Sequence, residues 1–484
     1  MTSPTFRIIG FIIGIFLITL AVSMVVPMLT LLVYHRAFEL RPFVWASLLT
    51  FLAGATLVLR GRPEQVNLRP RDMYMLTVSS WVVVAVFAAL PFVFTQHISY
   101  TDAFFESMSG ITATGSTVLS GLDTMSPGIL IWRSLLHWLG GIGFIGMAVA
   151  ILPMLRIGGM RLFQTESSDR TEKVMPRSHM VAKSIVLVYV GFTLLGTLGF
   201  WLAGMNGFDA VNHAMSAIST GGFSTSDQSL AKWHQPAVHW VAVVVMILGS
   251  LPFALYVSTL RGNRLALWRD EQVRGFIGLL LASWGVMGTW YWATTGLPWG
   301  EALRHVAFNV TSVITTTGFA LGDYSLWGNF ALMFFFYLGF IGGCSGSTAG
   351  GIKVFRFQVA WILLKASLNQ LIHPRAVIRQ QYNRHRLDEE IVRSVLTFSF
   401  FFGATIGLIA LALGLMGLDW MTALTGAAST VAGVGPGLGD TIGPAGTFAP
   451  LPDMAKWLLA FGMLVGRLEI VTVLVLFMPA FWRH

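Results

Sequence analysis

The stretch Thr315-Thr316-Thr317-Gly318, followed by Phe319, is a run of small hydroxyl residues ending in glycine within a strongly apolar chain. Similar stretches recur at comparable intervals: Thr112-Ala113-Thr114-Gly115, Ile218-Ser219-Thr220-Gly221 and, more loosely, Ala432-Gly433-Val434-Gly435. Internal recurrence indicates a fold built from repeated units. We therefore interpret the chain as four copies of one unit, each contributing one such stretch to a shared axis. The register of the fourth stretch is open, because it could end at Gly433 instead.

The composition of the chain indicates a membrane protein. Of its 484 residues, 55% are hydrophobic and only 11% are charged, whereas soluble domains carry about 25% charged residues. The net charge of +9 does not indicate nucleic-acid binding, because the basic residues lie in short loops between apolar runs. Cys344 is the single cysteine, so no internal disulfide is expected. The sequence predicts an all-α polytopic membrane protein.

Ten apolar runs are long enough to span a bilayer as helices. We place them at Phe6–Val33, Pro42–Leu59, Met73–Thr95, Ile129–Leu155, Val181–Gly204, His234–Thr259, Gly275–Thr295, Leu326–Leu364, Val392–Met416 and Met454–Phe481. The first run is too long for a signal peptide and lacks a small-residue cleavage site, so we expect it to be a retained helix. It forms a leading hairpin with the second run, and the other eight runs form four pairs.

Each of these four pairs encloses a half-apolar segment that is too short to span the bilayer. The segments are Asp102–Ile111, Asp209–Ala217, Gly300–Ile314 and Asp419–Thr430. One such segment could equally be an extracellular loop, but four in equivalent positions favour re-entrant pore helices around one pseudo-fourfold pore. The predicted organisation is a leading hairpin at residues 1–71 and four pore repeats at residues 72–179, 180–273, 274–389 and 390–484.

The distribution of Lys and Arg predicts the orientation. Most of these residues fall in four loops, Arg60–Arg71, Arg156–Lys183, Arg261–Arg274 and Lys365–Arg393, all on the same side of the predicted topology. Positively charged loops remain in the cytoplasm. We therefore expect both termini in the cytoplasm and the short segments to enter the membrane from outside.

The four glycine-ended stretches are suited to a dehydrated monovalent cation. Non-helical chain at membrane depth must line a cavity or be buried in protein. Carbonyl and hydroxyl oxygens directed at one axis can replace the water around the ion, and the carboxyl ends of the pore helices favour positive charge. No ring of carboxylates or of Arg and Lys occurs here, which argues against a divalent-cation filter and an anion pore. The predicted filter comprises Thr112, Ala113, Thr114, Gly115, Ile218, Ser219, Thr220, Gly221, Thr315, Thr316, Thr317, Gly318, Ala432, Gly433, Val434 and Gly435.

A second glycine-rich stretch interrupts the run Leu326–Leu364. Glycine costs a helix about 1 kcal/mol relative to alanine, so this stretch should break the helix at mid-membrane. Close helix packing through small residues is the alternative. We favour an unwound loop below the filter that obstructs the pore as a gate. Its predicted residues are Gly342, Gly343, Cys344, Ser345, Gly346, Ser347, Thr348, Gly350, Gly351 and Lys353.

Arg467 lies deep in the last apolar run. A central arginine costs at least about 2.5 kcal/mol on insertion scales, so it should face the protein interior with a partner. It could instead reach the membrane interface, although its depth disfavours this. We predict that Arg467 contacts carbonyls or hydroxyls of the glycine-rich stretch and holds the gate closed. Glu469 is on a different helix face and is a poor partner for it.

With these motifs in place, the whole chain resembles the Trk/Ktr/HKT potassium transporters, and within them the TrkH-type subunits. The resemblance rests on Asp102-Ala103-Phe104-Phe105-Glu106-Ser107, Gly221-Gly222-Phe223-Ser224-Thr225, Ile341-Gly342-Gly343-Cys344-Ser345-Gly346-Ser347-Thr348, His373-Pro374-Arg375-Ala376-Val377, Gly435-Pro436-Gly437-Leu438-Gly439 and Gly466-Arg467-Leu468-Glu469. It implies potassium uptake across a bacterial inner membrane, a homodimer embedded in lipid, and regulation by a cytoplasmic nucleotide-binding ring of the TrkA type. In plant relatives a serine at the first filter glycine accompanies sodium transport, so Gly115 favours potassium.

Other functions are less consistent with the sequence. A sodium-permeable or non-selective monovalent cation transporter of the same architecture is the nearest alternative. An intramembrane enzyme or receptor is disfavoured, because no paired acid/base residues or metal ligands lie at membrane depth and four repeated filters would have no purpose. We expect no catalytic residues, no cofactor bound by this chain, no nucleic-acid partner and no metal ion other than K⁺. The loops Arg156–Lys183 and Lys365–Arg393 are solvated connections or docking sites for the regulatory partner.

Overall fold

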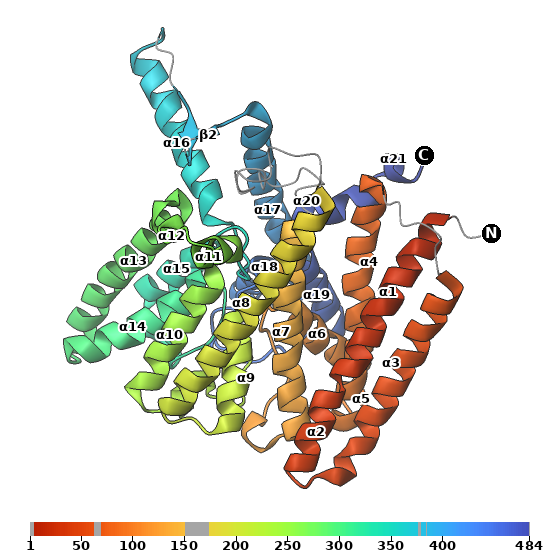
Figure 1. Ribbon diagram of the computed structural model, residues 1–484. Helices are drawn as coiled ribbons and strands as arrows, with labels where there is room; N and C mark the ends of the chain where they lie inside the picture. The colour runs from red at the N-terminus through yellow and green to blue at the C-terminus, as the bar shows by residue number, and fades with distance from the viewer. Residues whose placement is uncertain (1–3, 62–68, 151–173, 376–378, 384, 484) are drawn as a thin grey trace.

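The computed structural model describes residues 4–61, 69–150, 174–375, 379–383 and 385–483. It is a bundle of helices, most of them tilted along one common direction (Figure 1). The two ends of the chain lie at the same end of this bundle, and the hairpin turn between α2 and α3 lies at the opposite end (Figure 1).

The leading hairpin forms the edge of the bundle. It consists of α1 (Pro4–Ser23), α2 (Val25–Val33) and α3 (Leu40–Gly61), with the 3₁₀ turn η1 (Ala37–Glu39) between them. Gly14 and Gly54 lie where α1 crosses α3. A Cβ added at Gly14 would lie 2.7 Å from the Gly54 carbonyl oxygen, and one at Gly54 would lie 2.8 Å from the Gly14 carbonyl oxygen. Small residues therefore allow these two helices to pack backbone to backbone, as in membrane helix pairs.

The remaining helices repeat one order: an outer helix, a short helix and an inner helix. In the first unit these are α4 (Pro70–Ala88) with α5 (Leu90–Gln96), α6 (Tyr100–Thr112) and α7 (Pro127–Ala150). The second has α8 (Val174–Leu202), α9 (Gly207–Ile218) and α10 (Pro236–Ser250) with α11 (Phe253–Leu260). The third has α13 (Glu271–Thr295), α14 (Trp299–Ile314), α15 (Asn329–Leu338) and α16 (Val354–Ile372). The fourth has α17 (Glu389–Leu415), α18 (Trp420–Ala432) and α19 (Asp453–Arg467) with α20 (Ile470–Leu474).

Shorter elements join these units. They are η2 (Leu122–Thr124), η4 (Ser229–Lys232), α12 (Ala266–Arg269), η5 (Tyr324–Trp327), β1 (Gln381–Tyr382), β2 (His385–Arg386), η6 (Val475–Phe477) and α21 (Pro479–Trp482). The two strands pair antiparallel, with Gln381 opposite Arg386 and Tyr382 opposite His385. The loop predicted at Arg156–Lys183 lies mostly outside the described residues.

Three of the four short helices begin at residues whose side chains satisfy free N–H groups. Ser99, Asn206 and Asp419 each accept a hydrogen bond from the backbone of the first turn, which is the usual role of such residues at a helix start. Asp419 therefore caps α18. Asp102 and Asp209 lie inside the first turn, where their own N–H groups bind the capping side chains.

The inner helices of the second and fourth units are bent. Between α10 and α11 the chain turns by 91°, and between α19 and the segment formed by α20 and η6 it turns by 115°. In the third unit α15 ends at Leu338 and α16 begins at Val354, so the break predicted for Leu326–Leu364 is present. The sequence analysis missed the other two breaks, although Pro252 marks the first of them. Proline at that point removes a helical hydrogen bond.

Seven helices in the described part of the chain are long and apolar enough to cross a membrane, or nine if each bent pair forms one span. This agrees with a polytopic membrane protein. The predicted span that is not among them, Leu326–Leu364, is divided between α15, a helix of 10 residues, and α16.

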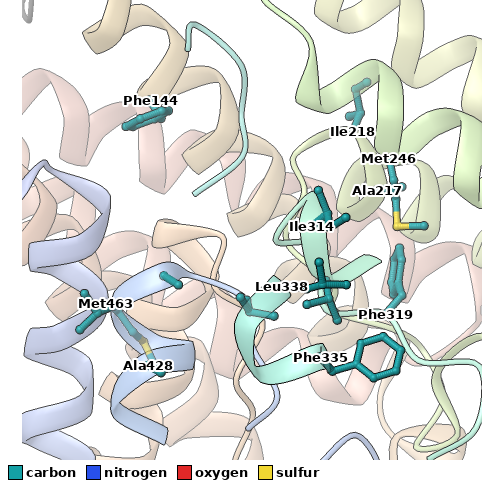
Figure 2. Packing of buried hydrophobic residues seen from close by; sticks show 14 of the residues in the cluster. Phe144, Ala217, Ile218, Met246, Ile314, Phe319, Phe335, Leu338, Ala428 and Met463 are labelled. Carbon is teal, nitrogen blue, oxygen red and sulfur yellow. The ribbon is translucent and has the colours of Figure 1, made fainter. Parts of the chain in front are cut away.

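Three of the short helices pack against the inner helix of a neighbouring unit as well as their own. Thus α9 contacts α7, α14 contacts α10, and α6 contacts α19, which brings the first and fourth units together. Apolar side chains fill the spaces between units. Figure 2 shows Ile314, Phe319, Phe335 and Leu338 gathered between α14 and α15. This packing places the carboxyl ends of the four short helices in the interior.

Candidate functional site: four glycine-ended segments and a loop beneath them

The chain follows the same path as it leaves each short helix. The residue just after or near the helix end has a positive φ, and so does the glycine two positions later. These pairs are Ala113 (53°) and Gly115 (89°), Thr220 (53°) and Gly222 (85°), Thr316 (55°) and Gly318 (81°), and Gly433 (72°) and Gly435 (105°). In every case the residue between these two donates its backbone N–H to a carbonyl oxygen of the helix: Thr114 to Ser109, Gly221 to Ser216, Thr317 to Ser312 and Val434 to Ser429.

This equivalence corrects the register of the second stretch. The sequence pattern placed its end at Gly221, but Gly222 has the backbone conformation of Gly115, Gly318 and Gly435. The predicted quartet Ile218–Gly221 therefore lies one residue too early, because either of two adjacent glycines could fit the pattern. The fourth stretch, whose register was open, ends at Gly435. We define segments 1 to 4 as residues 112–115, 219–222, 315–318 and 432–435.

The four segments are neighbours in a closed ring. A Cβ added to the closing glycine of each segment would meet the carbonyl oxygen of the next segment's third residue. The distance between the added Cβ and the carbonyl oxygen would be 2.2 Å for Gly115 and Gly221, 1.9 Å for Gly222 and Thr317, 2.1 Å for Gly318 and Val434, and 2.7 Å for Gly435 and Thr114. All four are shorter than any real Cβ contact. Glycine is therefore required at these positions by close backbone approach as well as by φ.

The hydroxyl groups of the segments are engaged by the protein. Thr112 and Thr114 share a hydrogen bond of 2.8 Å, and so do Thr315 and Thr317. By contrast, the carbonyl oxygens that meet the glycines, those of Thr114, Gly221, Thr317 and Val434, accept no hydrogen bond from the described residues. All four residues are buried. Buried carbonyls normally have a partner, so these four oxygens are free to bind a ligand.

A cavity of about 190 Å³ opens beyond the closing glycines. Gly115, Gly222 and Gly318 line it, together with residues 442–448 of the fourth unit. The backbone N–H of Phe448 donates to the carbonyl oxygen of Thr117 over 2.8 Å, which ties this cover to the first unit. The ring therefore communicates with a polar cavity on one side.

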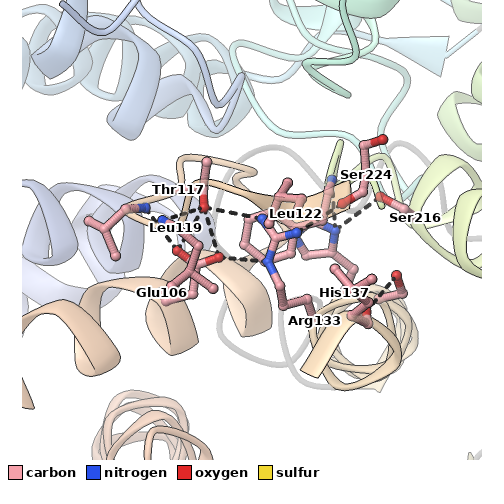
Figure 3. A network of polar contacts seen from close by, with 12 residues as sticks. Glu106, Thr117, Leu119, Leu122, Arg133, His137, Ser216 and Ser224 are labelled. Carbon is pink, nitrogen blue, oxygen red and sulfur yellow. Dashed lines mark hydrogen bonds and ion pairs between the residues drawn. The ribbon is translucent and has the colours of Figure 1, made fainter. Parts of the chain in front are cut away.

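Sequence analysis missed a charged network directly behind segments 1 and 2. Glu106 in α6 and Arg133 in α7 form an ion pair of 2.8 Å, with side chains 0% and 1% exposed. The pair is also bonded to Thr117 and Ser224 (Figure 3). Glu106 belonged to a quoted motif and Arg133 to the run Ile129–Leu155, but nothing in their spacing indicated that they meet.

On the other side of the ring lies the loop between α15 and α16. We call residues 339–353 the glycine-rich loop. Its two ends pair with each other, because Gly342 N–H donates to Ile352 over 2.9 Å and Ile352 N–H donates to Phe340 over 3.0 Å. The middle is bonded to the break between α10 and α11: Cys344 N–H donates to Ser250 over 2.9 Å. Two breaks in neighbouring units thus satisfy each other's backbone groups, as membrane depth requires.

The loop contacts three of the four segments. Gly350 N–H donates to the hydroxyl of Thr316 over 2.6 Å, and a Cβ at Gly350 would lie 2.4 Å from the carbonyl oxygen of Ala432. The hydroxyl of Thr348 lies 3.2 Å from that of Thr220 and donates to the carbonyl of Ile218. The loop therefore lies directly against the helix-side ends of segments 2, 3 and 4, as the sequence analysis predicted.

Arg467 is buried at the end of α19, where it contacts this loop. Its Nη1 donates to the carbonyl oxygen of Thr348 over 2.7 Å, and its guanidinium lies 4.1 Å from the centre of the Phe144 ring. The predicted contact with a carbonyl of the loop is thus confirmed. Nε and Nη2 have no hydrogen-bond partner within the described residues. The side chain does not extend to the surface.

Glu469 pairs with a different arginine. At the sharp turn after α19 it adopts a φ of 63°, and its carboxylate accepts from Arg356 of α16 over 2.7 Å. Arg356 also lies 3.6 Å from the centre of the Phe398 ring in α17. Lys353 donates to the carbonyl of Ala349 in the loop. Lys353 and Arg356 are both buried, so neither side chain faces solvent.

Hydrogen bonds also connect the loop with the β-hairpin. Asn383 in the turn accepts from Glu271 N–H over 2.8 Å and donates to Asp270 over 2.9 Å, at the start of α13. Gln272, the next residue, accepts from Ser345 N–H of the loop over 2.7 Å. A path of hydrogen bonds therefore leads from a segment outside the helical bundle to the glycine-rich loop.

Among the described residues, no group of three or more His, Cys, Asp or Glu side chains could hold a metal ion. The arrangement offers carbonyl oxygens in a ring, a cavity on one side and an obstructing loop on the other. Such an arrangement is suited to the passage of a small cation and provides no reactive group for catalysis at its centre.

Comparisons with known proteins agree with this geometry. The TrkH family, described as cation transport protein, matches residues 40–484. The Trk system potassium uptake protein TrkI of Halomonas elongata is 51% identical over 96% of this chain and 95% of its own length. The Trk system potassium uptake protein TrkH of Escherichia coli is 36% identical over 99% of this chain and all of its own.

A solved structure matches the entire fold. The crystal structure of the potassium transporter TrkH from Vibrio parahaemolyticus superposes with a TM-score of 0.91 at 34% identity, covering 99% of this chain and all of that one. The family is one of transporters and not of enzymes. With the ring, the loop and these similarities taken together, the chain belongs to the TrkH family of cation transport proteins.

Proposed function

We propose that this protein takes up potassium across a bacterial inner membrane, through the ring formed by segments 1 to 4. The observation that carries the proposal is the set of four buried carbonyl oxygens, from Thr114, Gly221, Thr317 and Val434, that lack donors and lie in a closed ring. A dehydrated K⁺ ion would supply the missing partner for all four. The carboxyl ends of four helices add negative potential at the same place.

The proposal includes one pseudo-fourfold pore, built by the leading hairpin and four repeats with the boundaries predicted above. The closed order of contacts between the segments supports it, as does the packing of α6 against α19. Ten spans result if α15, the loop and α16 cross the membrane together. Both termini would then lie in the cytoplasm, consistent with their common end in Figure 1.

We further propose that the glycine-rich loop is the gate and that Arg467 holds it closed. The loop lies against three segments, and the cationic guanidinium contacts it at Thr348. A buried positive charge beneath the ring would oppose the passage of K⁺. Among the described residues the guanidinium makes a single hydrogen bond to the loop, so the loop can leave it without breaking a wider network.

Control by a cytoplasmic nucleotide-binding ring of the TrkA type remains a proposal, supported by the names of the Trk-system relatives. The β-hairpin provides a route by which such a partner could act, through Asn383, the start of α13 and Gln272, on Ser345 of the loop. Assembly as a homodimer in the lipid bilayer is also proposed. It agrees with the exposed apolar side chains of α16, such as Trp361 and Leu368, and the mass of the detergent-solubilised protein tests it.

Uptake measurements in cells that lack their own potassium systems test the proposed function. Cells that carry this chain with its cognate regulatory subunit should accumulate K⁺ and Rb⁺ from micromolar to millimolar external concentrations. Failure to accumulate either ion, with the protein present in the membrane, would overturn the proposal. Accumulation of Na⁺ at the same rate would favour the alternative, a sodium-permeable or non-selective transporter of the same architecture.

A further inference from the structure

We propose that Arg133 and Glu106 are positioning residues that fix the spacing between segments 1 and 2 and thereby help to set the preference for K⁺ over Na⁺. This inference rests on the proposed function and adds the residues on which its selectivity depends. Neither side chain belongs to the ring. Both lie behind it, fully buried, and their contacts reach the chain on the outer side of two closing glycines.

The guanidinium of Arg133 bridges the two segments. Its Nη2 donates to the hydroxyl of Thr117 over 3.1 Å, and its Nη1 donates to the carbonyl oxygen of Ser224 over 2.9 Å. Thr117 and Ser224 occupy the same position relative to Gly115 and Gly222. The planar, rigid fork of arginine therefore fixes the distance between equivalent points of two neighbouring segments.

Glu106 fixes the position of Arg133 and of the chain that follows segment 1. Its carboxylate accepts from Arg133 Nε over 2.8 Å, from the Val118 N–H over 2.9 Å and from the Thr117 hydroxyl over 3.0 Å. All three donor nitrogens of Arg133 are thus engaged. Removing both charges would leave a core of similar shape without the bridge.

The other units have no carboxylate at the position equivalent to that of Glu106. At the position equivalent to Glu106, His213 lies 2.9 Å from the Ser224 hydroxyl and Asn309 accepts from the Leu321 N–H over 3.0 Å. In the fourth unit this position is Gly426, and the preceding Thr425 accepts from the Leu438 N–H over 3.0 Å. Within the described ranges, the charged bridge occurs between segments 1 and 2 alone.

The spacing of the carbonyl oxygens matters for selectivity because these oxygens replace the hydration shell of K⁺, and a ring that can contract fits the smaller Na⁺ as well. Segments 1 and 2 already meet closely, since a Cβ at Gly115 would lie 2.2 Å from the carbonyl oxygen of Gly221. A rigid support behind this contact resists further approach. Without the bridge, we expect transport to persist with weaker discrimination.

The test uses the full-length protein purified into liposomes, with ⁸⁶Rb⁺ uptake measured in competition with external K⁺ or Na⁺. Two variants are compared with the wild type: the neutral pair Glu106→Gln/Arg133→Met and the charge-retaining Arg133→Lys. We expect both to transport ⁸⁶Rb⁺ and the ratio of K⁺ to Na⁺ inhibition constants to shift toward unity by about tenfold, the effect of losing one or two charge-assisted hydrogen bonds.

The matched control is the other ion pair of α6, in which Lys456 is buried and Asp102 is partly exposed. Lys456 and Asp102 lie 2.6 Å apart at the opposite end of this helix, away from the segments. Asp102→Asn/Lys456→Met should leave the ratio unchanged. An unchanged ratio in the neutral pair would overturn the inference, and if that protein is not recovered, Arg133→Lys decides by the same criterion. Absence of ⁸⁶Rb⁺ uptake by the wild type would instead refute the proposed function.

Discussion

Two buried arginines flank the ring, and they are held in different ways. Arg133, on the side of the polar cavity, donates through all three nitrogens and pairs with a carboxylate. Arg467, on the side of the loop, makes one hydrogen bond to a carbonyl, and its other two nitrogens lack partners among the described residues. The first arrangement ties several groups together, whereas the second depends on one hydrogen bond. The comparison indicates that the ring is rigid on one side and movable on the other.

The largest effect on K⁺ uptake should come from a methyl group added between segments 2 and 3. In Gly222→Ala the new Cβ would lie 1.9 Å from the Thr317 carbonyl oxygen, at a φ of 85° that alanine rarely adopts. We expect K⁺ uptake to be abolished in cells, with the protein still present in the membrane. Gly278→Ala is the control, because nothing lies within 4 Å of its added Cβ. Normal uptake by Gly222→Ala would mean that segments 2 and 3 do not meet as described.

Removing one arginine at a time should cost different amounts of stability on the two sides of the ring. Arg133→Met leaves Glu106 buried without its cation, so we expect the free energy of unfolding to fall by about 3–5 kcal/mol. Arg467→Met removes a cation with two unpaired donors, and the loss should be within about 1 kcal/mol. Thermal unfolding in detergent measures both. Equal losses for the two variants would contradict the comparison.

Replacement of Arg467 should change flux more than it changes stability. Arg467→Ala removes the contact with Thr348 and the positive charge beneath the ring, so we expect basal ion flux in the absence of a regulator to rise severalfold. The matched control is Arg264→Ala, which removes an exposed arginine. Unchanged or reduced flux through well-expressed Arg467→Ala would count against its role in closing the gate.

A smaller effect is expected at Thr348. Its hydroxyl donates to the carbonyls of Ile218 and Gly249, each over 2.9 Å. Thr348→Val keeps the shape and removes these bonds, which should cost about 1–3 kcal/mol and raise basal flux less than Arg467→Ala does. Thr289→Val serves as the control, because that hydroxyl is exposed and bonds only within its own helix. Basal flux equal to that of the control would show that this contact does not hold the loop.

Much of the helical framework could be predicted because its signals are local. Apolar length located the spans, and small hydroxyl residues before glycine located the four short helices. What failed was the choice between adjacent glycines at Gly221 and Gly222, since φ is set by the tertiary position and not by residue type. The bend at Glu469 was missed because a strained non-glycine residue leaves no sequence signal.

Contacts between distant residues were also beyond the sequence. Arg467 could be assigned an interior partner because a charge in an apolar span requires one. Arg133 and Glu106 lie near the predicted membrane boundary, where single charges are common, so nothing indicated that α6 and α7 bring them together. The same holds for Arg356 and Glu469, which come from different repeats.

The most direct test of the central claim is cation flux through the purified protein in liposomes that contain no other transporter. Uptake of ⁸⁶Rb⁺ driven by a membrane potential is measured with external K⁺ and then with an equal concentration of external Na⁺. External K⁺ should inhibit this uptake far more strongly than Na⁺ does, and the Gly222→Ala protein should show no uptake. Flux that does not distinguish K⁺ from Na⁺, or that persists in Gly222→Ala, would contradict a potassium pathway through the four segments.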